Sequence, residues 1–350
     1  MQIFVTGGAG FIGSNFIHHT LALHRNTTIV NYDKLTYAGN LENVATLANH
    51  PNYRFIRGDI CDGARVFEAM RGCDVVVHFA AESHVDRSIY EPGPVIDTNI
   101  TGTFTLLKVA RELQVKRFVQ VSTDEVYGDL PQGVCSTEEF PLAPSSPYAA
   151  SKAAADMLVR SFVRTYRFPA LITRASNNYG PYQFPEKFLP LIISNALADK
   201  PLPVYGDGKQ QRDWLHVEDH CRGILAVIER GRVGETYNLG GGSVEMNISM
   251  VRRVLRLLGK TEDLISYVAD RPGHDRRYAL DCTKAREELE WAPTIGLEEG
   301  LQSTVTWYER NSAWLERVRG GEYREYYERY YVHRDASIRG LATATPRTVT

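Results

Sequence analysis

Two neighbouring acids, Asp124 and Glu125, stand in the segment "VSTDEVYG", where a buried strand is expected to end. Side chains of adjacent strand residues point to opposite faces, so both acids reach one substrate only if the strand ends at about Thr123. Adjacent like charges push two pKa values apart, which leaves one carboxyl group protonated and the other ionised. Such a pair suits an elimination, in which a carboxylate removes a proton and a carboxylic acid protonates the departing oxygen. The alternative is an acidic cap that opens a short turn.

A second candidate pair, Tyr148 and Lys152, lies four residues apart in "SSPYAASKAAADMLVRSF", on one face of a predicted helix. Ser146 followed by Pro147 is typical of a helix N-terminus. A free tyrosine has a pKa of about 10 and is a poor base at neutral pH, but a lysine ammonium one turn away, together with the positive charge of a hydride-accepting ring, favours the phenolate. Such a tyrosine removes the proton of an alcohol as a hydride departs. The alternative is a tyrosine at the edge of the core beside a solvated lysine.

A glycine-rich loop, "FVTGGAGFIGS", places Gly7, Gly10 and Gly13 between a predicted strand and a predicted helix. Glycines there let the backbone approach a pyrophosphate, which the helix N-terminus attracts. Asp33 follows twenty residues after Gly13 and can accept from the ribose hydroxyls of an adenosine. Its charge disfavours a 2′-phosphate, so the loop predicts NAD rather than NADP, although Lys34 next to it weakens that preference. The alternative is an ordinary glycine-rich turn.

The first half of the chain alternates short apolar strands with helices, which predicts an α/β fold with a doubly wound parallel sheet of the Rossmann type. After residue 175 the sequence becomes rich in Pro, Gly and aromatic residues, which indicates a smaller substrate-binding lobe. We therefore expect a nucleotide-binding domain over 1–175, a lobe over 176–333 with segments that return to the sheet, and a loose tail over 334–350. The predicted strands are Ile3–Thr6, Thr28–Asn31, Tyr53–Arg57, Val75–Phe79, Phe118–Ser122 and Ala170–Arg174, and the main helices are Phe11–Leu23, Val95–Leu113 and Pro147–Tyr166.

Composition narrows the possible partners. The formal net charge of -2 gives no electrostatic reason to expect nucleic-acid binding. No apolar run approaches the roughly 20 residues that span a bilayer, and no signal peptide precedes the first strand, so we expect a cytoplasmic protein. The five cysteines are widely spaced and lack a C-x-x-C pair, which indicates reduced structural thiols. No cluster has metal-ligand spacing, so no metal site is predicted.

The glycine loop, Asp33 and the Tyr148/Lys152 pair resemble the extended short-chain dehydrogenase/reductase family. Five segments, "AAESHVDRS", "STDEVYG", "NNYGPYQFPEK", "GDGKQQRDWLHVEDH" and "RPGHDRRY", are similar in type and order to those of the nucleotide-hexose 4,6-dehydratases, over about residues 1–330. This resemblance implies that dTDP-glucose is oxidised at C4, loses water across C5 and C6, and receives the hydride back at C6 from NADH. It also implies that Asp124 is the acid and Glu125 the base, while Thr123 hydrogen-bonds the C4 oxygen beside Tyr148.

Cofactor and substrate residues follow from strand-end positions and from the same resemblance. The loops after the third and fourth strands are expected to meet the adenine and the pyrophosphate, because ligands bind at the carboxyl ends of parallel strands. The resemblance assigns the diphosphate to cationic side chains, the nucleoside to a strand of the second lobe and the carboxamide region to Asn178. The predicted cofactor residues are Gly7, Gly10, Phe11, Ile12, Gly13, Asp33, Lys34, Thr36, Asp59, Ile60, Ala80, Ala81, Thr98, Tyr148, Lys152 and Asn178. The predicted substrate residues are Ser83, Asp86, Thr123, Asn177, Lys187, Pro203, Tyr205, Arg212, Asn247, Arg271 and His274.

The same resemblance implies a homodimer, in which Val95–Leu113 and Pro147–Tyr166 pair across a two-fold axis as a four-helix bundle. Three other functions stay open at this point. A nucleotide-sugar 4-epimerase needs NAD and Tyr148 but has no use for a C5 base. A UDP- or GDP-hexose 4,6-dehydratase shares the chemistry and differs in the nucleotide pocket. A non-catalytic NAD-binding sensor has no use for the acid pair.

Overall fold

A computed structural model describes residues 1–320 of the chain. Its centre is a seven-stranded sheet in which every strand pairs parallel to its neighbours, in the order β10-β6-β5-β4-β1-β2-β3. The strand order reverses direction at β1, which creates the crevice where such folds bind ligands. The strands are β1 (Gln2–Thr6), β2 (Thr28–Asp33), β3 (Tyr53–Arg57), β4 (Val75–His78), β5 (Arg117–Thr123), β6 (Ala170–Ala175) and β10 (Thr236–Leu239).

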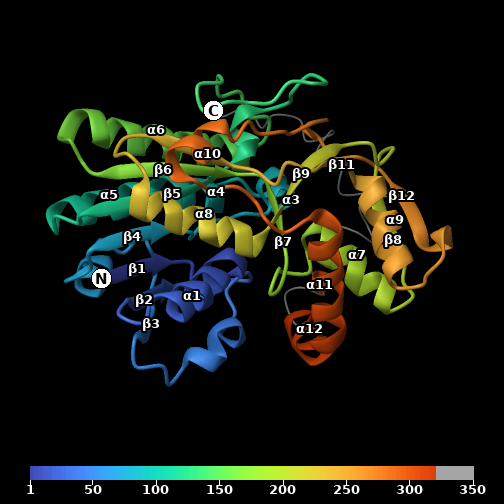
Figure 1. Cartoon of the computed structure of the whole chain (residues 1–350), viewed down its shortest axis with the longest axis horizontal. Coiled ribbons are helices and arrows are strands. Elements are labelled where there is room, and N and C mark those ends of the chain that lie inside the picture. Colours follow the sequence, from blue (N-terminus) through green and yellow to red (C-terminus); the bar gives the residue numbers. More distant parts are fainter. Residues whose placement is uncertain (321–350) are drawn as a thin grey trace, which may run out of the picture.

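Helices cover both faces of this sheet (Figure 1). One face packs on α1 (Phe11–Leu23) and α8 (Val217–Arg230). The other face packs on α2 (Gly63–Met70), α5 (Thr103–Glu112) and α6 (Pro147–Tyr166). Because both faces are covered, the strands are apolar along their whole length, as their burial shows for β4 and β6. The predicted α/β fold with a doubly wound sheet is confirmed.

Helix α10 (Thr283–Leu289) packs beside β10 and α8, whereas most of the remaining described elements gather beside the carboxyl ends of the strands, on the right in Figure 1. Two small sheets have the orders β11-β9-β7 and β12-β8. A separate apolar core joins these sheets to the flanking helices, with Trp214 and Tyr308 among its buried rings. The elements are β7 (Asn177–Tyr179), β8 (Leu202–Tyr205), β9 (Gln211–His216), β11 (Val244–Met246), β12 (Ile265–Val268), α7 (Phe188–Leu197), α9 (Asn247–Leu257), α11 (Leu297–Arg310) and α12 (Ser312–Val318).

One predicted helix differs in detail. The segment expected to be a single helix over Val95–Leu113 forms α4 (Gly93–Ile96), a π-helical stretch η2 (Asp97–Gly102) and then α5. The wider turn includes Asn99, whose side-chain amide donates to the Glu82 carbonyl and to Ser151 Oγ. Insertions of this kind arise where a side chain must be re-aimed, which hydrophobic periodicity does not reveal.

Within residues 1–320, no helix is long and apolar enough to cross a membrane. The five cysteines are all free thiols, as predicted. One late segment, β10, returns to the main sheet beside β6, in agreement with the expected crossing of the chain between the two parts. The expected tail, residues 334–350, lies outside the described residues.

Candidate active site

The acid pair begins a 3₁₀ turn. Strand β5 ends at Thr123, and η3 (Asp124–Tyr127) follows at once. The Thr123 hydroxyl accepts from the Glu125 amide at 3.2 Å and donates to Asp124 Oδ1 at 3.2 Å. Thr123, rather than an acid, is therefore the cap of the turn. The acids are left for another role, and the predicted break in strand geometry is confirmed.

Asp124 lies where its neutral form is favoured. Its side chain is buried, and Oδ2 has no hydrogen-bonding partner among the described residues. Burial raises the pKa of Asp124 well above its ordinary value, and the charges of Glu125 and Asp213 raise it further. A carboxyl group in these surroundings holds its proton at neutral pH.

Glu125 lies in different surroundings from its neighbour. Burial raises its pKa, but the cations Arg271, Arg212 and Lys187 oppose that shift. These three charges favour the carboxylate, whereas Asp124 has two further acids around it. These surroundings favour the protonated form at Asp124 more than at Glu125, which suits a proton donor at the first position and a base at the second. This is the order that the sequence resemblance implied.

Tyr148 and Lys152 lie on the buried face of α6, below the same turn. The helix starts as predicted, because Ser146 Oγ accepts from the Ala149 amide and Pro147 occupies the first turn. Burial raises the pKa of Tyr148, as do the charges of Glu125 and Asp124, while its hydrogen bond to Thr123 lowers it. Burial also lowers the pKa of Lys152 to about 8.

Lys152 Nζ donates to the Val121 carbonyl at 2.7 Å. Burial has the largest effect on the pKa of Tyr148 and raises it. A cationic ring bound beside Tyr148 would favour the phenolate. The activation of Tyr148 by the lysine together with such a ring stays a prediction.

A cavity of about 280 Å³ runs along the carboxyl ends of the strands, from β2 and β3 across to β6. Every residue of the predicted cofactor set lines it, together with Thr123, Asp124, Glu125 and Ser83. Ser83 was predicted for the substrate, and its carbonyl accepts a short hydrogen bond from Lys187 Nζ.

The glycine loop fits a dinucleotide. No side chain caps the N-terminus of α1 at Gly10, so the first backbone N–H groups of the helix stay available for a pyrophosphate. Asp33 is buried at the end of β2 and accepts from the Ala9 and Leu35 amides at 2.9 and 2.8 Å. Lys34 pairs with Asp59 at 2.7 Å, which directs its charge away from a 2′-phosphate. The loop thus favours NAD over NADP.

Gly7→Ala is expected to remove the bound dinucleotide. Gly7 has a φ of +72°, and an added Cβ would lie 2.6 Å from the Ala80 backbone nitrogen. The left-handed conformation alone costs a side chain about 1–2 kcal/mol. Gly133→Ala is the matched control, since Gly133 has a φ of +79° and open space around it. Cofactor content after purification is the measurement, and a Gly7→Ala protein with wild-type content would contradict this account of the loop.

A second cavity of about 170 Å³ adjoins the first, and Glu125, Asn177 and Lys187 line both. Apart from Ser83 and Thr123 in the first cavity, every residue of the predicted substrate set lines it: Asp86, Asn177, Lys187, Pro203, Tyr205, Arg212, Asn247, Arg271 and His274. Arg212 is buried, stacks at 4.3 Å on the Tyr278 ring and donates to the Gln211 and Asp275 carbonyls. The cations suit a diphosphate.

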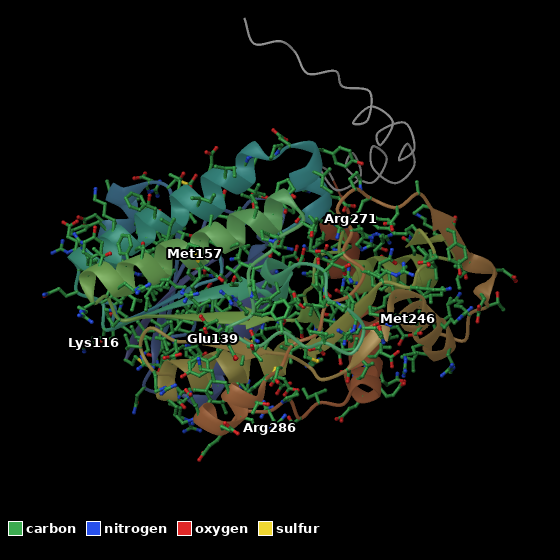
Figure 2. The ribbon with its side chains drawn as sticks, turned by 90° about the horizontal axis from the view of Figure 1, so that it is seen from above. Lys116, Glu139, Met157, Met246, Arg271 and Arg286 are labelled. Atoms are coloured by element: carbon green, nitrogen blue, oxygen red, sulfur yellow. The ribbon has the colours of Figure 1, made fainter. Side chains whose placement is uncertain are left out.

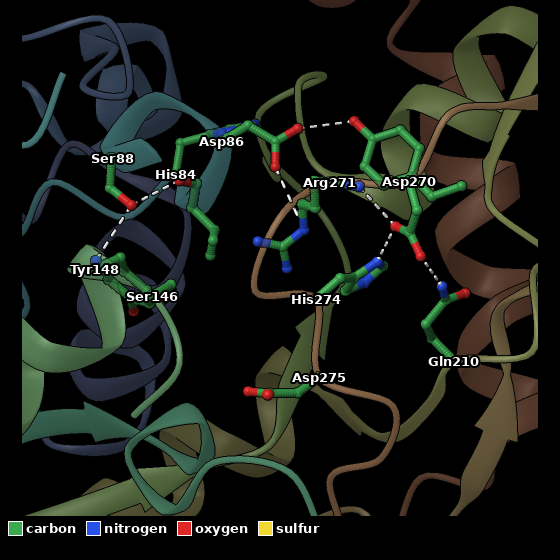
Figure 3. Close-up of polar contacts among 12 residues, drawn as sticks. His84, Asp86, Ser88, Ser146, Tyr148, Gln210, Asp270, Arg271, His274 and Asp275 are labelled. Atoms are coloured by element: carbon green, nitrogen blue, oxygen red, sulfur yellow. Dashed lines mark hydrogen bonds and ion pairs between the residues drawn. The ribbon is translucent and has the colours of Figure 1, made fainter. Parts of the chain in front are cut away.

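Helix α3 (Val85–Tyr90) connects this cavity to the catalytic helix (Figure 3). Asp86 accepts from the Tyr205 hydroxyl at 2.8 Å and lies 3.5 Å from Arg271 Nε. Two residues further on, Ser88 Oγ accepts from the Tyr148 amide at 3.2 Å. Arg271 and the start of α6 are thus both held by this short helix, through residues that lie two positions apart.

The His274 side chain forms a hydrogen bond with Asp270 on the same loop. Its Nδ1 lies 2.6 Å from Asp270 Oδ1, and Gln210 donates to the other oxygen of Asp270 at 2.8 Å (Figure 3). Burial lowers the pKa of His274, which keeps the ring neutral at pH 7. A neutral His274 contributes a ring edge and a hydrogen bond to the cavity rather than a charge.

Some lining residues were not predicted. Those of the second cavity were within reach of sequence reasoning, because Glu186, Trp214 and Tyr278 stand inside the quoted motifs. His220 lines the first cavity from α8 and shares a 2.8 Å hydrogen bond with Asn178 Oδ1. His220 is the last residue of the quoted segment "GDGKQQRDWLHVEDH", so it was within reach of the same reasoning.

Comparisons with known proteins show which family the chain belongs to. The family model described as GDP-mannose 4,6 dehydratase matches residues 4–304. The chain therefore belongs to this family of nucleotide-sugar dehydratases. Within the family, the chain is 52% identical over 340 residues to a dTDP-glucose 4,6-dehydratase of Xanthomonas campestris pv. campestris, an alignment that covers 91% of this chain and 96% of the relative.

Solved structures of similar proteins have the same fold. A crystal structure of dTDP-glucose 4,6-dehydratase from Bacillus anthracis in complex with NAD is 50% identical, with a TM-score of 0.86 and coverage of 91% of this chain and 99% of that one. The enzyme of the same name from Streptomyces venezuelae, also with NAD bound, is 48% identical, with a TM-score of 0.89 and coverage of 91% and 100%. The resemblance to the nucleotide-hexose 4,6-dehydratases is confirmed.

Proposed function

We propose that this chain is a dTDP-glucose 4,6-dehydratase, which converts dTDP-glucose to dTDP-4-keto-6-deoxyglucose and water. The observation that carries the proposal is the pair Asp124 and Glu125, adjacent in one turn but opposite in electrostatic surroundings. Glu125 lines both cavities, so a sugar between the nucleotide and the cofactor meets the pair. The names of the similar enzymes support the same reaction.

The cofactor would be NAD, held by the glycine loop, Asp33 and Lys152, and when bound it accepts a hydride from C4 and returns one to C6. Tyr148 takes the proton of the C4 hydroxyl, which turns the alcohol into a ketone. Thr123 Oγ1 lies between the acid turn and Tyr148, where it can hydrogen-bond that oxygen.

The ketone acidifies the hydrogen on C5. Glu125 removes this proton, while Asp124 gives its own proton to the C6 hydroxyl, which leaves as water. Glu125 then returns a proton to C5, and Asp124 is protonated again before the next turnover. The net change is loss of one water, with the oxidation state of the cofactor restored.

The other functions are less well supported. A 4-epimerase has no step that uses a C5 base. It would therefore not explain why two adjacent acids are buried at a cost in folding free energy. A non-catalytic sensor would leave Tyr148, Lys152 and both acids without a role. For a UDP- or GDP-hexose dehydratase the chemistry is the same, and the similar enzymes named above act on the dTDP sugar by their names.

The test is to incubate the pure full-length protein with dTDP-, UDP- and GDP-hexoses without added NAD. We expect a 4-keto-6-deoxy product from dTDP-glucose, because NAD copurifies with the protein and is not consumed. Production of a C4 epimer instead, or of the dehydrated sugar from another nucleotide alone, would contradict the proposal.

The assembly we propose is a homodimer through a four-helix bundle of α5 and α6 from each subunit. Four large apolar side chains on these helices and on the adjoining α4 are exposed: Ile96, Phe104, Met157 and Tyr166. Met157 is labelled on α6 in Figure 2. A monomer gains nothing from this surface, whereas a second copy would cover it by the same elements, as two-fold symmetry requires. The cytoplasmic location and the division at residue 175 also remain predictions.

The double variant Phe104→Lys/Met157→Lys is expected to sediment as a monomer. Both side chains are nearly half exposed, at 46% and 43%, so lysines there leave a single subunit undisturbed. Across a dimer interface they would bring four like charges into an apolar contact. Leu23→Lys, at an apolar position on α1 that is also exposed (61%), is the control. If wild type and double variant sediment alike, these helices do not form the interface.

A further inference from the structure

Arg174, near the end of β6, has the largest fully buried side chain in the described residues. Its side chain is fully buried, and its Nε donates to Asp156 Oδ2 at 2.9 Å. Its Nη1 donates to the Tyr127 hydroxyl at 3.0 Å. Neither Arg174 nor its two partners lines either of the two cavities. This cation is therefore not a substrate ligand.

The two side-chain partners of Arg174 belong to the two catalytic elements, and Nη1 also donates to the Glu138 carbonyl at 3.4 Å. Tyr127 is the last residue of η3, the turn that begins with Asp124 and Glu125. Asp156 lies one helical turn beyond Lys152 and two beyond Tyr148, on the buried face of α6. Arg174 thus links the turn η3, which begins with Asp124 and Glu125, to the helix α6, which carries Tyr148.

The sheet fixes Arg174 itself. In the parallel register it lies opposite Ser122 on β5, one residue before the acid turn begins, and opposite Asn238 on β10. The Tyr127 hydroxyl donates onward to Asn238 Oδ1 at 2.7 Å. The network contacts both strands that flank β6, so it fixes both catalytic elements relative to the sheet.

Stability alone is a poor reason for this network. Desolvating a buried ion pair costs about as much as the attraction returns, and apolar residues of the same size often serve as well. Here Arg174 Nη2 and Asp156 Oδ1 have no hydrogen-bonding partner within residues 1–320, so the pair is not even fully satisfied. What a rigid planar fork provides, and an apolar side chain does not, is fixed geometry between two elements.

We propose, on the basis of the dehydratase function above, that Arg174 is a positioning residue which holds the turn of Asp124 and Glu125 in register with the helix of Tyr148 and Lys152. The reaction needs both elements on one sugar, since C4 oxidation uses the helix and water loss uses the turn. A small shift between them separates the two steps. Asp156 also raises the pKa of Lys152 against its burial, which helps to keep the lysine charged.

Tyr127→Phe tests the arm that reaches the acid turn. It removes one hydroxyl and keeps the ring, and Tyr237→Phe is the matched control. Tyr237 is also fully buried on the sheet, and its hydroxyl also has two partners, the Arg232 amide and Glu288. We expect comparable losses of melting temperature. Only Tyr127→Phe should slow water loss, by about 10- to 100-fold, while C4 oxidation persists and reduced cofactor accumulates on the enzyme.

A second variant and a measurement without substrate complete the test. Asp156→Asn cuts the other arm and should slow C4 oxidation instead, so no reduced cofactor should accumulate. Amide hydrogen exchange over Asp124–Tyr127 should rise in Tyr127→Phe and stay at the wild-type rate in Tyr237→Phe. Equal kinetics and equal exchange in the two tyrosine variants would overturn the positioning role. A wild-type protein that forms no dehydrated sugar would instead refute the proposed function, and the exchange result would still decide the role of Arg174.

Discussion

Glu125→Gln is expected to stop the reaction after C4 oxidation. The substitution keeps the shape of the side chain and leaves Asp124 and Tyr148 in place, but an amide cannot remove the C5 proton. Water loss should fall by about 10²- to 10⁴-fold, the range for loss of a general base. A 4-keto hexose that still carries its C6 hydroxyl should accumulate with reduced cofactor, and C5 exchange with heavy water should slow by a similar factor.

Asp124→Asn is the matched comparison for the neighbouring acid. It keeps the C5 base but has no proton to give to the C6 hydroxyl, so the sugar should still be oxidised and should still exchange C5 hydrogen. Only the departure of water should slow. Normal C5 exchange in Glu125→Gln together with slow exchange in Asp124→Asn would mean that the two roles are reversed. If both variants eliminate water at the wild-type rate, the two acids have only a structural role in the turn.

Tyr148→Phe is expected to abolish the first step. The ring would still fill its buried place on α6, so the melting temperature should change little. Without the hydroxyl, no group takes the C4 proton, and oxidation should fall by at least about 10²-fold. The measurement is the near-ultraviolet absorbance of reduced nicotinamide after mixing with dTDP-glucose.

Tyr308→Phe serves as the control for that variant. Tyr308 is also fully buried, and its hydroxyl donates to the Gln183 carbonyl at 2.6 Å, away from the reacting groups. We expect it to reduce its cofactor at nearly the wild-type rate. Reduced cofactor formed at that rate by Tyr148→Phe would remove Tyr148 from the mechanism.

Much of the fold follows from local sequence. Helix Phe11–Leu23 and helix Pro147–Tyr166 have the predicted bounds, because a glycine loop starts the first and a Ser-Pro cap starts the second. The six predicted strands agree with the structure to within two residues at each end, since a strand buried on both faces is apolar throughout. The π-helical stretch at Asp97–Gly102 escaped prediction, because its cause is a contact of Asn99 with segments far along the chain.

The site, like the fold, could be predicted only in part from the sequence. Motifs located the lining residues of both cavities, since each lies at the end of a predicted strand or within a recognised segment. Electrostatic state was harder to predict. The hydrogen bond from Lys152 to the Val121 carbonyl, for example, has no signal in the local motif. From the sequence, Arg174 would be interpreted as the polar end of a strand. Its burial depends on Asp156 and Tyr127, which are 18 and 47 residues away in the chain. No local pattern reports such partners.

One isotopic measurement tests the central claim that oxidation and reduction occur on the same sugar. The protein is incubated, without added NAD, with dTDP-glucose that carries deuterium at C4. The account predicts dTDP-4-keto-6-deoxyglucose with that deuterium at C6, because the hydrogen taken from C4 returns within the turnover, and it predicts unchanged NAD content. Deuterium lost to solvent or retained at C4, or NAD consumed in proportion to product, would contradict it.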